Sequence, residues 1–518
     1  MFAVIFLAGL IAPEIVLSAS DDCPLNCTCK DNLVKCHGCN SVPQQFGNFS
    51  VIEILDLSHN NLTSLTKNDF EKFINLQKLY LNENKISDIE NGTFSSLVHL
   101  SVLNLSCNSL STIKEGVFCN LKSLSILYMK RNSIENLSLD VFHNVPKLQY
   151  ISLAENGLYG FDACTFQIRS LRILVLDNNS LSSIPSNIFN CTPNLHTIRL
   201  NLNRITHISD YTFSNLPNIS SVSLDYNRIT HLEIYSFEVR HDDPNSLMEC
   251  QIQRFTIVGN QLTEVPQALD DLVYVDHLDI SGNSITRIET QVFYRLQKLR
   301  YLRISEMPLL NYIAPFAFGG LDLRDLHMTR NPKLRKLPEN LLQSMNNLRT
   351  VIISNNALQS VPKNLCKWHM LMDMMMNDND FICGCGVHWL QTYSGWGTPQ
   401  TRQHAENLKC HKPGNSENVL IKDFDFDHLG CTYTSVVHKS RVLVGLTAAT
   451  LVLLTVCVIL FMYRNRKRII FRYRQFKYRR HTDSAYTIEH KYMYSDLSTN
   501  GDVHGDVPTT KDKDNLLT

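Results

Sequence analysis

The sequence predicts an α/β fold, a horseshoe-shaped solenoid with a parallel β-sheet on its concave face. The prediction rests on three observations. A leucine-rich pattern recurs between Ile52 and Leu371, cysteine clusters lie on either side of it, and an uncharged apolar stretch follows. The expected parts are a signal peptide (1–20), a cysteine-rich N-terminal cap (21–51), about fourteen repeats (52–381), a cysteine-rich C-terminal cap (382–431), a juxtamembrane stalk (432–441), a transmembrane helix (442–463) and a cytoplasmic tail (464–518).

The chain begins with an apolar segment. The stretch FAVIFLAGLIA follows Met1, and the small residues Ser18, Ala19 and Ser20 come after it. An apolar run that ends in small residues is typical of a cleavable secretory signal. We therefore expect residues 1–20 to direct export, and the residues after them to fold in an oxidising compartment.

The repeated pattern has the form LxxLxLxxNxL. Two examples are LQKLYLNENKI at 76–86 and LSVLNLSCNSL at 100–110. This motif, recurring at a nearly constant spacing of this size, identifies leucine-rich repeats. With tolerant substitution the pattern starts at Ile52, Leu76, Leu100, Leu124, Leu148, Leu171, Leu195, Ile219, Ile252, Val275, Leu299, Leu323, Leu348 and Leu371.

Each part of the repeat has a structural reason. The LxL core alternates with period two, which predicts a short strand. The recurring Asn, as at Asn60 and Asn84, lies where the chain turns and can satisfy backbone groups there. A phenylalanine precedes most repeat starts and is expected to stack into an apolar spine: Phe70, Phe94, Phe118, Phe142, Phe189, Phe213 and Phe293. One repeat buries too little apolar surface to fold alone, so the stack must fold together.

Two repeats depart from the pattern. Met307 stands where Asn is expected, so we expect the row of asparagines to be interrupted there. Extra residues follow Phe237, in the stretch EVRHDDPNSLMECQ. We expect this insertion to form a loop on the convex or side surface. A tolerated surface insertion is at least as good an interpretation as a binding loop.

Two groups of four cysteines flank the repeats. The first is Cys23, Cys27, Cys29 and Cys36, and the second is Cys383, Cys385, Cys410 and Cys431. In an exported chain these cysteines are expected to form disulfides, because the compartment is oxidising. Metal binding by Cys36 and Cys39 is therefore disfavoured. Four cysteines allow three connectivities, and spacing alone does not select one.

The repeats and cysteines together resemble extracellular leucine-rich-repeat proteins with cysteine-rich caps, such as Toll-like receptors, Slit and neuronal adhesion proteins. The similarity covers about residues 23–431, and its motifs are CPLNCTC and CGCGVHWL with Trp389. The resemblance implies the pairs Cys23–Cys29, Cys27–Cys36, Cys383–Cys410 and Cys385–Cys431. Seven other cysteines precede residue 441, an odd number, so one is free or bridges to another chain.

An apolar stretch predicts a membrane anchor. Residues 442–463 carry no charge, and an α-helix of about 20 apolar residues spans a bilayer. A run of lysines and arginines follows at 464–480, the pattern of a stop-transfer segment, which favours a membrane role for it over nucleic-acid binding. We therefore expect a single-pass type I protein of the plasma membrane with an extracellular N-terminus.

The residues after 463 are polar and are expected to be disordered. They are too few for the cytoplasmic signalling domain of a Toll-like receptor. Tyr494 and Leu497 fit a tyrosine-based sorting signal, and Leu516 with Leu517 fits an acidic dileucine signal. Tyr486, Tyr492 and Tyr494 are alternative phosphorylation sites.

The sequence favours binding over catalysis. It contains no GxSxG, HExxH or phosphate-binding glycine loop, so we expect neither an enzyme nor a cofactor. The leading interpretation is a cell-surface receptor or co-receptor, with a possible role in innate recognition, for an extracellular protein or polyanionic glycan. The alternatives are an adhesion or guidance protein and a decoy or endocytic receptor. Homo- or hetero-oligomers with a co-receptor are possible, and no nucleic acid is required.

Sequons for N-glycosylation lie only in the N-terminal half of the expected solenoid. Asn104 occupies an outward position of a predicted strand, so a glycan there would stand on the concave face. The predicted acceptors are Asn26, Asn48, Asn61, Asn91, Asn104, Asn136, Asn178, Asn190 and Asn218.

A basic patch is expected on the concave face of the sequon-free half. It consists of Arg300, Tyr301, Arg303, Arg324, His327, Arg330 and Arg349. Only Glu306 and Asp325 offset its charge at outward positions of those repeats. Arg and Tyr are enriched in binding hot spots, so the patch is the predicted ligand surface for an acidic partner. An ordinary solvated face is an equally weighted alternative.

Overall fold

The computed structural model describes residues 23–162, 165–185, 188–214, 216–239, 249–414, 417–429 and 431. The predicted signal peptide, stalk, transmembrane helix and tail lie outside these residues, as do the tail positions singled out above and residues 240–248 of the insertion. Within the described residues, no helix is both long and apolar enough to cross a membrane.

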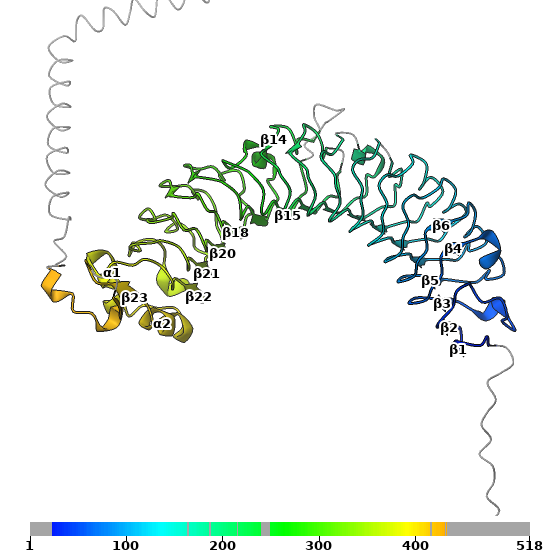
Figure 1. Cartoon of the computed structure of the whole chain (residues 1–518). Helices are drawn as coiled ribbons and strands as arrows, with labels where there is room; N and C mark the ends of the chain where they lie inside the picture. The colour runs from blue at the N-terminus through cyan, green and yellow to red at the C-terminus, as the bar shows by residue number, and fades with distance from the viewer. Residues whose placement is uncertain are drawn as a thin grey trace, which may run out of the picture. The chain divides into compact units, whose positions relative to one another are not determined.

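One β-sheet of 16 strands organises the described chain. Its strands line the inner side of the arc in Figure 1. The first two strands are antiparallel, and every later neighbour in the sheet is parallel. In sheet order they are β1 (Cys27–Lys30), β2 (Leu33–Cys36), β3 (Ile54–Asp56), β5 (Lys78–Tyr80), β7 (Val102–Asn104), β8 (Ile126–Tyr128), β9 (Tyr150–Ser152), β10 (Ile173–Val175), β11 (Thr197–Arg199), β13 (Ser221–Ser223), β15 (Arg254–Thr256), β16 (His277–Asp279), β18 (Tyr301–Arg303), β20 (Asp325–His327), β21 (Thr350–Ile352) and β22 (Asp373–Met375).

The strands lie where the repeat pattern predicts them. From β3 onward each begins two residues after one of the fourteen repeat starts. The central residue of each strand is buried, whereas most of the residues on either side of it are half-buried, as in β5. Because side chains alternate along a strand, the leucine of each repeat enters the core and its neighbours face the concave surface.

A left-handed turn follows each strand. His59, Glu83 and Leu202 have φ angles of 56°, 56° and 57°, and each directly precedes a repeat asparagine. Glycine takes this position at Gly259 and Gly282, where φ is 67° and 68°. The positive φ reverses the chain direction and aims the asparagine side chain into the solenoid.

The buried asparagines hydrogen-bond from one repeat to the next. Asn203 accepts from the Leu181 amide at 3.1 Å and donates to the Leu176 carbonyl at 2.9 Å. At the exceptional repeat, the buried Met307 has no side-chain amide to offer. Its own backbone N–H instead donates to Asn331 Oδ1 at 2.9 Å, so the row resumes one repeat later.

Phenylalanines fill the space behind the sheet. Phe213 stacks between Phe189 at 5.9 Å and Phe237 at 5.4 Å, and all three are buried. The segments behind the sheet are short: β4 (Ser64–Leu65) with β6 (Asp88–Ile89), β12 (His207–Ile208) with β14 (His231–Leu232), β17 (Arg287–Ile288) with β19 (Tyr312–Ile313), and the 3-10 turns η1 (Phe49–Val51), η2 (Lys67–Asp69), η3 (Ile188–Cys191), η4 (Gln267–Asp271) and η5 (Trp368–Met370).

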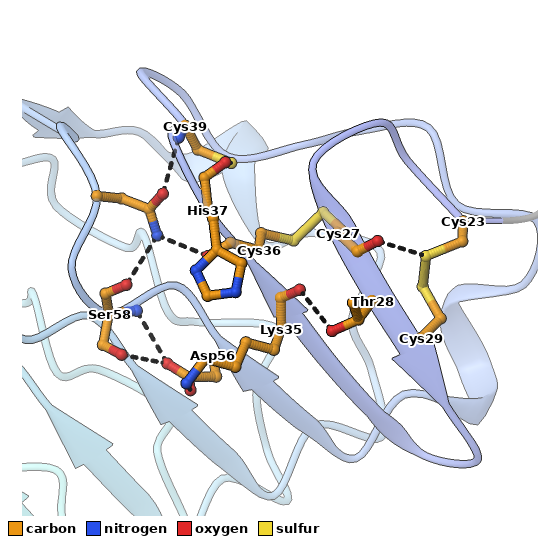
Figure 2. Close-up of a disulfide and its surroundings, with 11 residues drawn as sticks. Cys23, Cys27, Thr28, Cys29, Lys35, Cys36, His37, Cys39, Asp56 and Ser58 are labelled. Carbon is orange, nitrogen blue, oxygen red and sulfur yellow. Dashed lines mark hydrogen bonds and ion pairs between the residues drawn. A yellow bond between two sulfur atoms is a disulfide. The ribbon is translucent and has the colours of Figure 1, made fainter.

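Disulfides lie near both ends of the described chain. They join Cys23 with Cys29, Cys27 with Cys36, Cys383 with Cys410 and Cys385 with Cys431, the pairs that the resemblance implies. Figure 2 shows the N-terminal pair beside the ion pair of Lys35 Nζ with Asp56 Oδ2, 3.0 Å apart. Three of the four N-terminal cysteines lie in the antiparallel hairpin of β1 and β2. This hairpin extends the sheet because β2 pairs with β3.

The C-terminal segment packs against the last repeat. It comprises α1 (Cys385–Thr392), α2 (Pro399–Glu406), β23 (Lys409–His411), β24 (Asn418–Leu420), η6 (Ile421–Asp423) and η7 (Asp427–Leu429). Trp389 is buried and donates from Nε1 to the Val361 carbonyl at 2.7 Å. Its ring also contacts Trp368, with 5.3 Å between centroids. Aromatic packing and disulfides together therefore cover this end of the core.

Candidate ligand-binding surface

The basic patch occupies three positions of the repeat. Tyr301 and Arg303 lie in β18 and His327 in β20, on the concave face. Arg300, Arg324 and Arg349 each immediately precede a strand, and backbone hydrogen bonds of 2.8 Å join them in sequence. Arg330 lies in the left-handed turn after β20, with φ of 58°. The predicted residues therefore gather over three consecutive repeats, along two edges and the floor of the concave surface.

Stacked rings form the centre of the patch. Tyr301 lies between His277, at 4.2 Å between ring centroids, and His327, at 5.0 Å. Burial lowers the pKa of both imidazoles and raises the pKa of the Tyr301 phenol. Both histidines therefore favour the neutral form, and the stack is uncharged at neutral pH. His277 belongs to the preceding repeat and was missed by the sequence analysis.

Carboxylates pair with most of the arginines. Arg303 lies 3.7 Å from both Asp279 and Glu306. The other pairs are Arg330 with Glu306 at 3.1 Å, Arg324 with Asp325 at 3.9 Å, and Arg300 with Asp322 at 3.7 Å. Of these carboxylates, only Glu306 and Asp325 were expected from the sequence. Asp279 lies on the neighbouring strand and Asp322 just before a repeat start, so the patch is less basic than the sequence suggests.

A second exposed region lies nearer the N-terminus, and the sequence analysis did not single it out. Six half-buried apolar and aromatic side chains share the concave face of β5 to β10: Tyr80, Val102, Ile126, Tyr128, Tyr150 and Ile173. We call this the aromatic surface. The rings of Tyr128 and Tyr150 are 5.2 Å apart. Reading only the first and third residue of each predicted strand would have revealed it.

A hollow of about 500 Å³ adjoins the aromatic surface. Arg199 pairs with Asp177 at 2.7 Å and Lys130 with Glu155 at 2.7 Å in its wall. Tyr226, which is 57% exposed, also lines it. The charges of the hollow are therefore largely matched within the chain.

The predicted glycan acceptors differ in their surroundings. Asn26, Asn48, Asn61, Asn91, Asn136, Asn178, Asn190 and Asn218 are exposed. Asn104 is half-buried and is the third residue of β7. It is therefore the one predicted acceptor that projects from the concave sheet, and occupancy of all nine remains a prediction.

The remaining cysteines are divided. Cys191 takes part in a disulfide, and five described cysteines are free thiols: Cys39, Cys107, Cys119, Cys250 and Cys366. Burial raises the pKa of Cys250 to about 12, so that thiol stays protonated. Among the described residues, no group of three or more His, Cys, Asp or Glu side chains is arranged to hold a metal ion.

These features define the class of protein: a leucine-rich-repeat solenoid with disulfides near the ends of its described chain. The leucine-rich repeat family profile matches residues 42–86, 74–134, 169–229 and 274–332. The chain therefore contains leucine-rich repeats.

Among characterised proteins it is similar to Tsukushi of Gallus gallus, with 25% identity over 218 residues. It is also similar to Vasorin of Homo sapiens, with 26% identity over 179 residues. The first match covers 42% of this chain and 56% of Tsukushi, and the second covers 34% of this chain and 26% of Vasorin. The chain thus spans only part of the length of either relative.

Solved structures show the same fold. The TLR13–ssRNA13 complex aligns with a TM-score of 0.60 at 24% identity, covering 73% of this chain and 57% of that one. The Drosophila Toll–Spatzle complex aligns with a TM-score of 0.56 at 20% identity, covering 73% and 58%. At these identities the similarity establishes the solenoid and leaves the ligand to be argued from this chain's own surface.

Proposed function

We propose that this chain is a cell-surface receptor or co-receptor that binds an extracellular protein on the concave face of its solenoid. The basic patch is the proposed contact. The observation that carries the proposal is the His277–Tyr301–His327 stack, flanked by Arg303. Aromatic residues and arginine at the centre of a surface are the residue types that dominate protein–protein binding energy.

The ion pairs favour a protein partner over a polyanionic glycan. A polyanion is attracted by uncompensated positive charge, and its binding weakens as salt screens that charge. Here the guanidinium groups of Arg300, Arg303, Arg324 and Arg330 already lie within 4 Å of carboxylates. A protein surface can instead exchange partners with these pairs and bury the stacked rings, which contributes apolar as well as charged contacts.

Two further considerations support the proposal. The predicted signal peptide and transmembrane helix would present the solenoid outside the cell. The solved Toll–Spatzle complex, a molecular hub in Drosophila development and innate immunity, joins a protein of similar fold to a partner. A concave parallel sheet offers a large, rigid surface for such a role.

A binding screen on intact cells tests this function. Cells that express the full chain would be probed with a library of extracellular protein domains and, separately, with heparin. We expect at least one protein to bind, with binding retained after heparinase treatment of the cells. If heparin bound and no protein domain did, the ligand would be a polyanion and not a protein. Aggregation of the expressing cells, without capture of any soluble domain, would contradict a receptor and indicate adhesion.

A further inference from the structure

We propose that Asn104 carries an N-linked glycan whose first sugar packs between Tyr80 and Tyr128 and covers the aromatic surface. The glycan would then be a fixed part of the concave face. This inference does not depend on the identity of a ligand. It rests on the position of one sequon, Asn104-Leu105-Ser106, relative to the two strands beside it.

The register of the sheet places the three residues in one row. Tyr80 pairs with Asn104 across β5 and β7, and Asn104 pairs with Tyr128 across β7 and β8. All three side chains project from the same face, and adjacent strands are about 4.8 Å apart. The two tyrosines therefore flank the acceptor at a backbone separation of about 9.6 Å, twice the strand spacing. A pyranose ring fits between them at van der Waals contact of about 4 Å on either side.

The hydrogen bonds of Asn104 leave room for the modification. Its Nδ2 donates to Asn82 Oδ1 at 3.1 Å, and its Oδ1 accepts from the Ser106 amide at 3.0 Å. A side-chain amide has two N–H groups, so one remains for the sugar. In the transfer, a bond forms between Nδ2 and the anomeric carbon of a lipid-pyrophosphate-linked oligosaccharide. The sugar–pyrophosphate bond breaks, and the amide releases a proton.

The surroundings explain why this glycan would be ordered. The rings of Tyr128 and Tyr150 lie 5.2 Å apart, and Tyr80 is half-buried on the same face two strands from Tyr128. Burial raises the pKa of the Tyr128 phenol. A sugar presents the C–H groups of one ring face to such rings and its hydroxyl groups to water. Contiguous apolar patches on a folded protein usually mark surfaces that another group covers. Here a sequon places the covering group on β7, within the patch.

The position has a consequence for ligand access. A glycan held on β7 closes the concave face over the repeats that contain Tyr80 and Tyr128. The basic patch on β18 to β21 lies several strands further along the same sheet and stays open. The two regions would thus have opposite roles, one covered by the chain's own sugar and the other exposed to a partner.

Tyrosine oxidation by hydroxyl radicals, read by mass spectrometry, tests the proposal on the full chain from secretory cells. Peptide mapping should find Asn104 occupied. The Ser106→Ala variant removes the sequon but keeps Asn104, and we expect Tyr80 and Tyr128 to oxidise several-fold faster in it. The matched control Thr63→Ala removes the sequon of the exposed Asn61 and should leave both rates unchanged. Tyr226, outside the covered row, serves as an internal standard.

Three results would overturn the inference. The first is an unmodified Asn104, and the second is an occupied Asn104 with equal tyrosine oxidation in the two proteins. The third is protection of both tyrosines in Ser106→Ala by self-association, since a second copy would then be the cover. If Ser106→Ala is not exported, enzymatic removal of whole glycans from the folded native protein is the second comparison. It converts Asn104 to Asp and also removes the other accessible glycans, and we again expect Tyr80 and Tyr128 to oxidise faster, with Tyr226 as the internal standard.

Discussion

At the scale of single residues, the fold depends on one asparagine and one left-handed residue in each turn. The buried amide of Asn203 serves backbone groups of its own repeat and of the one before it. The sequence predicted this role because the asparagine recurs, yet it gave no indication that the residue before it takes a positive φ. That position holds His59, Glu83 and Leu202 in different repeats, so no common residue type marks it.

Removal of one buried asparagine amide should destabilise the fold. Asn203→Ala leaves the buried Leu181 N–H without its side-chain partner, whereas the Leu176 carbonyl keeps the Asn179 amide at 3.0 Å. One unsatisfied buried group costs about 1–3 kcal/mol, so we expect the free energy of unfolding to fall by about that amount. Denaturant titration measures it. The exposed Asn144→Ala should change it by less than about 0.5 kcal/mol. Equal unfolding midpoints for the two variants would refute a stabilising role for the row of buried asparagines.

His404 makes the C-terminal segment sensitive to acid. Its Nε2 accepts a hydrogen bond from the Met376 amide at 3.0 Å, which requires the unprotonated atom. Burial lowers the pKa of His404, while Asp373 and Asp378 partly offset that effect. The unfolded chain therefore takes up the proton first. Stability should be full above the usual histidine pKa of about 6.5 and should decline as pH falls below it.

Thermal unfolding between pH 7.5 and pH 5 measures this decline. His404→Gln should reduce the loss of melting temperature on acidification, because the amide oxygen of glutamine can accept the bond at every pH. His277 and His327 will maintain a smaller decline in that variant. The exposed His99→Gln is the matched control and should keep the native profile. An unchanged profile in His404→Gln would exclude His404 as the sensor.

At the scale of elements, the strands and the phenylalanine spine followed from the sequence, and the surface chemistry did not. Strand positions depend on a periodic pattern within each repeat, which one sequence displays directly. The ion pair of Arg303 with Asp279 joins residues that are in different repeats, so it depends on register between neighbouring strands. The stacking of His277 on Tyr301 has the same origin. Such contacts appear only once the repeats are aligned in space.

The spine makes a quantitative prediction. Phe213 is buried between two other phenylalanines, and its truncation would leave a cavity in the stack. We expect Phe213→Ala to lower the free energy of unfolding by about 3–5 kcal/mol. Phe316 is 68% exposed, so Phe316→Ala should have an effect of less than about 0.5 kcal/mol. Comparable losses in the two variants would show that the spine is not the stabilising element.

At the scale of the whole molecule, neighbouring repeats stabilise one another and together form one continuous surface. The N-terminal hairpin and the C-terminal segment pack on the two ends of the described solenoid. Each of these end segments contains two disulfides of its own. The concave face carries the aromatic surface, which we propose a glycan covers, and the basic patch further along the same sheet. The central claim is that this open patch binds the extracellular partner.

Reversing the charge of arginines in the basic patch is the direct test of this binding. The full chain with Arg303, Arg324 and Arg349 all changed to Glu would be compared, on intact cells, for binding of the protein found in the screen. Loss of a hot spot of about 2 kcal/mol or more weakens binding about 30-fold, and we expect at least that effect. The exposed Lys147, Arg204 and Arg228, changed together to Glu, provide the control. Arg324→Glu with Arg349→Glu leaves Asp279 paired, in case the triple variant is not exported. We expect weaker binding with normal surface expression in the patch variants alone. Unchanged affinity and salt dependence in a patch variant that reaches the surface would contradict it.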